Sequence, residues 1–310
     1  MNLWGKSESS KYVFKHNDIE DCEKQLIRAE KLSKQTGGAI LLITEGVFGM
    51  RGEQGRLKEI VALKKKYNFR LLVDDAHGFG TLGEGGRGTG FEQGVQDDID
   101  VYFATFAKSM AGIGAFLAGD KDVIQFLQYN MRSQTFAKTL PMAMVKGALK
   151  RLDMIRTMPE LKDKLWQNTN SLQSGLRLAG FDLGTTQTCI TPVFLKGDVP
   201  EAMALVHDLR ENHGVFCSIV VYPVIPKGLI ILRLIPTATH TQVDIDETIV
   251  AFTSWDWIDA NPWAELPGLP WTIVAAGAAI LGYKLSGKGL ALFAGLVMIY
   301  ISIFGQWKPS

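Results

Sequence analysis

Hydrophobic and polar positions alternate between helical and strand patterns in the first half of the chain. The apolar spacing from Ile19 to Leu32 predicts an amphipathic helix that begins at Asn17 or Asp18, both good N-cap residues. A continuous apolar run at residues 39–44 (AILLIT) then predicts a fully buried strand. The chain therefore opens with a helix followed by a strand.

The same alternation continues along the chain. Residues 56–67 (RLKEIVALKKKY) predict an amphipathic helix with a solvated lysine face, and residues 71–73 and 101–105 predict short buried strands. Residues 78–90 (GFGTLGEGGRGTG) are too rich in glycine for either element and predict a flexible loop. Alternating helices and buried strands indicate an α/β fold with a mostly parallel sheet.

The second half predicts a smaller α+β part. A short return strand after Lys108 precedes a helix at 123–131, and Pro141 is suited to open another helix. Further elements are predicted as a helix at 161–178, strands near 191–195, 215–222 and 229–234, and a helix at 200–212. We therefore expect a large domain at 1–150, a small domain at 151–256, and a separate tail at 257–310.

Polar side chains gather where two predicted strands end. Asp74, Asp75 and His77 follow the first strand, and Thr105 and Lys108 come at and after the second. The carboxyl ends of parallel strands are where open α/β sheets bind ligands, so these groups could converge on one ligand. Each also has an ordinary interpretation, as a strand-end turn, a helix cap or a loop histidine.

An acid, an imidazole and a lysine in one crevice suggest a carbonyl cofactor. Pyridoxal phosphate needs a lysine amine to form a Schiff base and a carboxylate to keep its pyridine nitrogen protonated. Lys108 lies between Phe106 and Met110, and no other charged residue occurs from 101 to 119. That is an unusual position for a fully solvated lysine.

Three linked motifs make a family resemblance specific. VDDAHGFGTLGEGGRGTG, TFAKSMAGIGAF and ILRLIPTATHT resemble the α-oxoamine synthases, which are fold-type I pyridoxal-phosphate enzymes, and the resemblance covers about residues 12–252. Members join an amino acid to an acyl-CoA with loss of carbon dioxide. The segment VVYPVIPKGLIILRLIPTATHT is most similar to the serine palmitoyltransferase branch of sphingolipid biosynthesis, although glycine- or alanine-using members stay possible.

The resemblance implies roles for five residues. Asp74 would pair with the pyridinium nitrogen, and His77 would lie against the cofactor's phenolic oxygen and the substrate. Thr105 would touch the phosphate, Lys108 would form the Schiff base and later remove the α-proton, and Arg233 would hold the substrate carboxylate. The ordinary interpretation of Arg233 is a sheet-edge arginine.

The family also implies a homodimer. The loop before Pro141 would reach the partner subunit's site, which makes Thr139 a candidate phosphate contact. Two departures stand out. Nothing in residues 1–15 matches the family's glycine-rich segment or its ring-stacking aromatic residue, so about a quarter to a third of a usual synthase is expected to be missing. Gly49 stands where many relatives carry a cofactor-binding serine.

Composition excludes several classes of function. Lysine and arginine number 33 against 32 acidic residues, so a formal charge of +1 implies no nucleic-acid surface and favours small-molecule substrates. The three cysteines, Cys22, Cys189 and Cys217, form no metal-ligand pattern. Their spacing and the lack of a signal peptide predict a cytoplasmic enzyme without a disulfide framework or metal site.

The composition changes after Trp255. A linker rich in tryptophan and proline leads to two nearly uncharged runs, 271–283 and 290–304, which predict a membrane hairpin within 269–307. This segment resembles the opening of the permease subunit of glycine-betaine/proline ABC transporters; the alternative is two buried helices. Two rivals to the synthase hypothesis follow: another pyridoxal-phosphate enzyme such as an aminotransferase, or an inactive membrane-tethered fragment.

Overall fold

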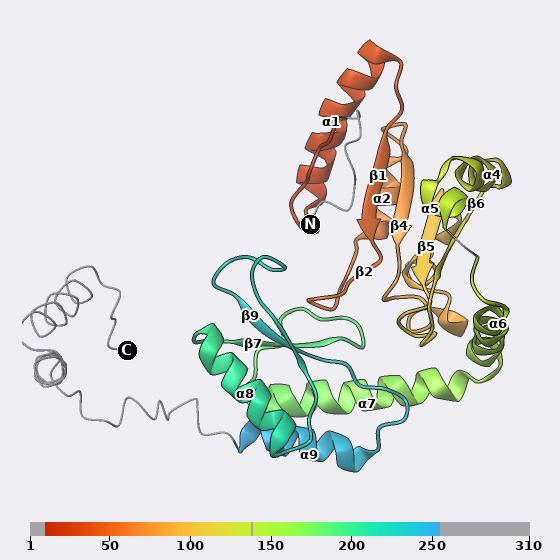
Figure 1. Ribbon diagram of the computed structural model, residues 1–310. Helices are drawn as coiled ribbons and strands as arrows, with labels where there is room; N and C mark the ends of the chain where they lie inside the picture. Colours follow the sequence, from red (N-terminus) through yellow and green to blue (C-terminus); the bar gives the residue numbers. More distant parts are fainter. Residues whose placement is uncertain (1–9, 138, 255–310) are drawn as a thin grey trace, which may run out of the picture. The chain divides into compact units, whose positions relative to one another are not determined.

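The structure is a computed structural model that describes residues 10–137 and 139–254 (Figure 1). The described residues up to Phe252 belong to one compact unit. Its helices and strands are, in chain order, α1 (Ile19–Thr36), β1 (Leu41–Glu45), β2 (Val47–Phe48), β3 (Glu53–Gln54), α2 (Leu57–Leu63), β4 (Arg70–Asp74), η1 (Glu84–Gly86), α3 (Thr89–Glu92), η2 (Gln96–Asp98), β5 (Val101–Thr105), β6 (Ala115–Gly119), α4 (Lys121–Asn130), α5 (Arg132–Phe136), α6 (Met142–Thr157), α7 (Pro159–Leu178), β7 (Thr191–Leu195), α8 (Val199–Glu211), β8 (Ser218–Val220), β9 (Ile230–Leu234) and α9 (Gln242–Thr253).

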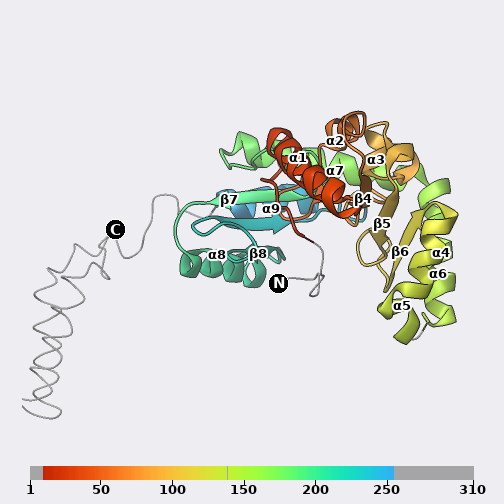
Figure 2. The same cartoon turned by 90° about the horizontal axis from the view of Figure 1, so that it is seen from above.

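The first sheet has the strand order β1-β4-β5-β6. β1, β4 and β5 run parallel, and β6 is the antiparallel return strand, so the prediction of a mostly parallel sheet is confirmed. Figure 2 shows β4, β5 and β6 following one another in this order, with α4 beside β6. The parallel register pairs Glu45 with Asp74 and Asp74 with Phe103, which brings the carboxyl ends of three strands to one edge.

The prediction that the first strand is fully buried is wrong. Successive side chains of β1 alternate between the buried face of the sheet and its more open face, as they do in the central strand β4. Leu41 is 53% exposed whereas Leu42 is buried. A continuous apolar run therefore did not show that one face of the sheet is more open than the other.

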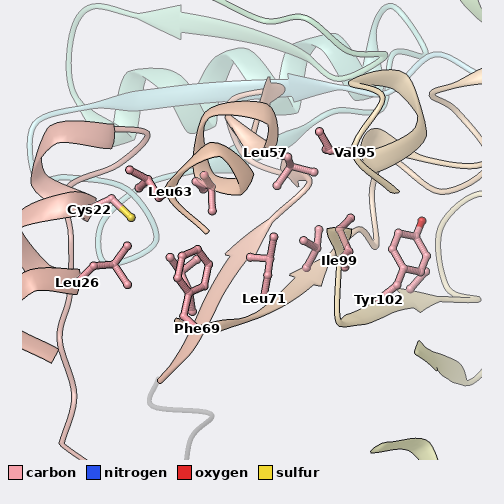
Figure 3. Close-up of a cluster of buried hydrophobic side chains, with 13 residues drawn as sticks. Cys22, Leu26, Leu57, Leu63, Phe69, Leu71, Val95, Ile99 and Tyr102 are labelled. Atoms are coloured by element: carbon pink, nitrogen blue, oxygen red, sulfur yellow. The ribbon is translucent and has the colours of Figure 1, made fainter. Parts of the chain in front are cut away.

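A buried cluster joins the first two helices to the sheet (Figure 3). Cys22 and Leu26 of α1 pack with Leu57 of α2 and with Phe69 and Leu71 at the start of β4. The predicted first helix is confirmed, because the Asp18 carboxylate accepts a hydrogen bond from the Asp21 N–H at 2.9 Å and caps it. Gly37 ends this helix with a left-handed φ of 71°.

The helix predicted at 56–67 is shorter than expected. Its predicted apolar face is confirmed, since Leu57, Ile60 and Leu63 are buried, but the helix ends at Leu63. The Lys64 side chain forms an ion pair with Asp100, in which Nζ lies 2.5 Å from Oδ2. The lysine run therefore begins a hydrogen-bonded turn that leads into β4 instead of a further helical turn.

The glycine-rich segment is built around Asp75, so the prediction that it carries no regular element is wrong. The buried Asp75 carboxylate accepts hydrogen bonds from the Thr89 N–H and hydroxyl, each at 2.7 Å, and from the Tyr102 hydroxyl at 2.8 Å. A Cβ added at Gly46, Gly78 or Gly88 would lie 2.1 Å from this carboxylate. The glycines therefore let the backbone close over Asp75, and the helical turns η1 and α3 form there.

The second sheet is antiparallel with the order β7-β9-β8. The predicted strand at 191–195 is confirmed, and those predicted near 215–222 and 229–234 are present as the shorter β8 and β9. Figure 1 places α7, α8 and α9 on the same side of this sheet, and α9 had no counterpart in the sequence-based expectations. The loop at 185–188 hydrogen-bonds Gly52 and Glu53 of the β2–β3 hairpin.

Two expectations concern the rest of the chain. In the part that the structure describes, no helix is both long and apolar enough to cross a bilayer. The predicted membrane hairpin at 269–307 lies outside the described residues. All three cysteines are free and buried.

Candidate active site

Asp74 and Lys108 lie at the ends of neighbouring parallel strands. Asp74 is the last residue of β4, and Lys108 belongs to the turn that follows β5. This turn is closed by hydrogen bonds from the Phe106 N–H to the Gly114 carbonyl at 2.9 Å and from the Gly112 N–H to the Phe106 carbonyl at 2.7 Å. The strand register and the closed turn fix both residues at the same edge of the sheet.

The Asp74 carboxyl group is half-buried. Removal from water raises its pKa, while the Ala76 N–H, 3.1 Å from Oδ1, and the positive charge of Lys108 lower it. A carboxyl group with this balance can exchange a proton with a nitrogen base bound in the crevice.

The His77 imidazole is neutral at neutral pH. Burial, followed by the positive charges of Lys108 and Arg233, lowers its pKa to about 4. Its ring packs against Gly49, because a Cβ added there would lie 2.3 Å from Nε2. A neutral imidazole has one N–H donor and one nitrogen acceptor, so it can orient a ligand by hydrogen bonding.

Arg233 belongs to the second sheet, and its side chain reaches the residues that follow β2. It lies on β9, and its Nη1 donates a hydrogen bond to the Gly49 carbonyl at 2.9 Å. The buried Nε has no hydrogen-bond partner in the structure, and burial lowers the pKa of the guanidinium. Arg233 therefore keeps hydrogen-bonding capacity beyond its contact with Gly49, as an arginine that binds an oxyanion must.

Lys108 differs from its sequence-based expectation. Its side chain is exposed, although the apolar neighbours Phe106 and Met110 suggested a position shielded from water. Met110 is buried and Phe106 is half-buried beneath the turn, so the two flanking residues anchor the turn and Lys108 projects from it. The lysine is thus presented to the crevice at the end of β5.

The two threonines stand apart from this group. The Thr105 hydroxyl donates to the Gly114 carbonyl at 3.1 Å and accepts from the Ala107 N–H at 3.1 Å, so it stabilises the turn that carries Lys108. Thr139 is exposed between α5 and α6. Within residues 10–137 and 139–254, no hydrogen bond joins Thr139 to Asp74, His77 or Lys108.

Glu45 was missed by the sequence-based search. It ends β1 directly beside Asp74 in the sheet register. The surrounding protein and the negative charge of Asp74 raise its pKa, and the Gly49 N–H lowers it by hydrogen bonding the carboxylate. The signal was available, because Glu45 follows a predicted parallel strand just as Asp74 does.

Comparisons with known proteins identify the family of the chain. Residues 6–252 match the family described as "Aminotransferase class I and II". A cysteate-C-fatty acyltransferase of Capnocytophaga ochracea is 69% identical over 244 residues, which are 79% of this chain and 58% of the relative. A serine palmitoyltransferase of Sphingobacterium spiritivorum is 38% identical over 234 residues, 76% of this chain and 57% of the relative.

Solved structures are similar as well. A serine palmitoyltransferase of Sphingomonas wittichii has a TM-score of 0.72 and 33% identity, covering 78% of this chain and 59% of that one. The chain thus spans less than two thirds of the length of these relatives. The permease-like tail lies beyond the residues of the family match. The chain therefore belongs to the class I and II aminotransferase family.

Proposed function

We propose that this chain is a pyridoxal-phosphate-dependent acyltransferase that condenses an α-amino acid with a fatty acyl-CoA and releases carbon dioxide. The observation that carries the proposal is the convergence of Asp74, His77, Lys108 and Arg233. Asp74 ends β4 beside β5, whose following turn carries Lys108, and Gly49 lies against the His77 ring while its carbonyl binds Arg233. Three separate segments of the chain therefore supply one site.

The residues present fit pyridoxal phosphate. The cofactor requires an amine, a carboxylate and room for a substrate carboxylate at a cation. Lys108 offers an exposed amine, Asp74 a half-buried carboxyl group, and Arg233 a guanidinium whose buried Nε lacks a partner. The unpaired Nε supports a bound oxyanion most directly, because buried N–H groups without a partner are rare.

When bound, pyridoxal phosphate would supply an electron sink that stabilises negative charge on the α-carbon of the amino acid. Lys108 would attach the cofactor and then take the α-proton as general base. Asp74 would keep a proton on the pyridine nitrogen, and Arg233 would bind the α-carboxylate. His77, neutral at the working pH, would orient the substrate through a hydrogen bond.

We propose cysteate as the amino acid, in place of the serine or glycine that the motifs suggested. The relative at 69% identity is named a cysteate-C-fatty acyltransferase, whereas the serine palmitoyltransferase stands at 38%. Cysteate carries a sulfonate in addition to its carboxylate. At neutral pH its net charge is therefore about −1, and the Arg233 guanidinium at the crevice would attract it over long range.

Thr105 and Thr139 stay proposed phosphate contacts, the second one across a homodimer interface. Thr105 lies at the end of β5, next to the turn of Lys108, which is a suitable place for such a contact. Size-exclusion chromatography with light scattering, with and without pyridoxal phosphate, tests the dimer. A monomer under both conditions would contradict it.

A product assay tests the function. The full chain is incubated with pyridoxal phosphate, a fatty acyl-CoA and either cysteate, serine, glycine or alanine, and products are identified by mass spectrometry. We expect a decarboxylated acyl product with cysteate at the highest kcat/KM, and its loss in Lys108→Ala. Preference for serine would refute the cysteate proposal but keep the acyltransferase.

The aminotransferase alternative is tested in parallel with a keto acid acceptor in place of acyl-CoA. Amino transfer without acyl transfer would replace the proposed function. Protein that is folded but inactive with every pair would favour the third possibility, a membrane-tethered fragment without activity.

A further inference from the structure

One residue of the candidate site has no side chain and touches several of the others. Gly49 is buried after β2, and a Cβ added to it would lie 2.3, 2.7 and 2.9 Å from the Nε2, Cδ2 and Cε1 atoms of His77. Such distances are far inside normal van der Waals contact. The imidazole of His77 therefore fills the space that a side chain at position 49 would need.

The backbone conformation does not require glycine here. Gly49 is absent from the described residues with positive φ, such as Gly52 at 69°, so an L-residue could adopt its backbone angles. The obstacle to a side chain is the position of the His77 ring, which would have to move. The closeness of His77 to position 49 therefore depends on glycine, and it would differ with the serine that many relatives carry there.

The backbone of Gly49 holds two further groups. Its carbonyl accepts the hydrogen bond from Nη1 of Arg233 at 2.9 Å, and its N–H hydrogen-bonds the Glu45 carboxylate. Arg233 is distant in the chain, so this contact joins the second sheet to the first. Gly49 thus contacts a group from β1, one from the segment after β4, and one from β9.

We propose that Gly49 is a positioning residue that sets the spacing between the His77 imidazole and the Arg233 guanidinium. A side chain at position 49 either displaces the imidazole or shifts the backbone of residue 49, and the second response would move the carbonyl that fixes Arg233. The two groups that would contact the amino acid are therefore placed together by one residue. The consequence for substrate binding rests on the proposed function, whereas the placement of His77 does not.

The first test follows His77 itself. Its titration is measured by NMR in the full chain and in Gly49→Ala, with the signal assigned from the His77→Gln variant. We expect the pKa of about 4 to rise by about one unit or more in Gly49→Ala, because the displaced ring gains water. An unchanged titration in folded Gly49→Ala would overturn the proposal.

Gly112→Ala is the matched control. Gly112 also lies in the candidate site, four residues after Lys108, but an added Cβ there meets its nearest atom, the Met110 carbonyl oxygen, at 3.6 Å, an ordinary contact. We expect the His77 titration to stay at its parent value in this variant. A shift as large as that in Gly49→Ala would show that the response is not specific to the His77 contact.

A stability cycle covers the case in which Gly49→Ala folds poorly. The urea midpoint is measured for the parent, Gly49→Ala, His77→Ala and the double variant. We expect Gly49→Ala to lower the midpoint in the parent but to change it little in the His77→Ala background, where the imidazole is gone. An equal loss in both backgrounds would contradict the proposal.

In cofactor-loaded protein, Gly49→Ser should raise KM for the amino acid at least tenfold with a smaller change in KM for acyl-CoA, because only the former depends on His77 and Arg233. Equal changes in the two KM values would contradict a positioning role. The NMR titration and the stability cycle need no turnover, so failure of the proposed function leaves them interpretable.

Discussion

Asp75 is predicted to be the most sensitive buried polar residue of the large sheet. Its carboxylate accepts three hydrogen bonds, two from Thr89 at 2.7 Å and one from Tyr102 at 2.8 Å, with no exposure to solvent. Hydrogen bonds to a charged group contribute about 1.5–3 kcal/mol each. Part of this is offset because burial raises the pKa of Asp75, which shows that the charge is costly to bury.

We therefore expect Asp75→Ala to lower the free energy of unfolding by roughly 3–5 kcal/mol, because three buried donors lose their acceptor and each unsatisfied group costs about 1–3 kcal/mol. Asp75→Asn keeps the shape and removes the charge, so it should cost roughly 1–3 kcal/mol. Tyr102→Phe removes one of the three donors and should cost about 1 kcal/mol.

The assay is urea unfolding of the full chain followed by circular dichroism at neutral pH. The order of loss, Asp75→Ala, then Asp75→Asn, then Tyr102→Phe, is a sharper test than any single value. Asp75→Ala within about 0.5 kcal/mol of the parent, the range of an ordinary surface substitution, would refute the account of the glycine-rich segment.

Three further predictions concern separate groups. His77 stays neutral in the folded protein down to a pKa of about 4, while the unfolded chain binds a proton near the ordinary value of 6.5, so its contribution of up to roughly 3 kcal/mol is lost as pH falls through this window; unfolding at pH 7 and pH 5 should show a smaller loss in His77→Gln, and an equal loss would contradict it. Arg233→Lys should raise KM for the amino acid more than it lowers kcat, since a lysine cannot form the planar fork; steady-state kinetics with an unchanged KM would count against carboxylate binding there. Burial raises the pKa of all three thiols, Cys22, Cys189 and Cys217, to about 11, so a thiol reagent should react slowly until denaturant is added; rapid labelling of native protein would disprove their burial.

Local patterns predicted the elements that are defined by short apolar runs. β5 and β7 have the bounds that their sequences predicted, because a buried strand is a run of apolar residues between polar ones. α9 was not predicted, since its apolar residues do not mark one face: Ile245, Ala251 and Phe252 are buried, whereas Val243 and Val250 are exposed. The exposure of the β1 side chains depends on what covers each face of the sheet, and no local sequence pattern gives that information.

The candidate site likewise has some residues that local patterns predicted and others that only the tertiary structure reveals. Asp74, His77 and Lys108 were identified from their positions after strands and from the family motifs. Asp74 and Asp75 are adjacent, so their side chains point to opposite sides of the chain. Composition alone does not say which of these sides is the crevice. Asp75 turned out to be the buried one. The importance of Gly49 is visible only once His77 is seen against it, since two residues far apart in sequence define that contact.

The most direct test of the central claim is the visible absorption spectrum of the full chain after addition and removal of excess pyridoxal phosphate, compared with Lys108→Ala. The account predicts a retained visible band from the cofactor joined to Lys108, and its absence from the variant. Folded protein that retains no such band, or a band that persists unchanged in Lys108→Ala, would contradict the assignment of Lys108 and of the site around it.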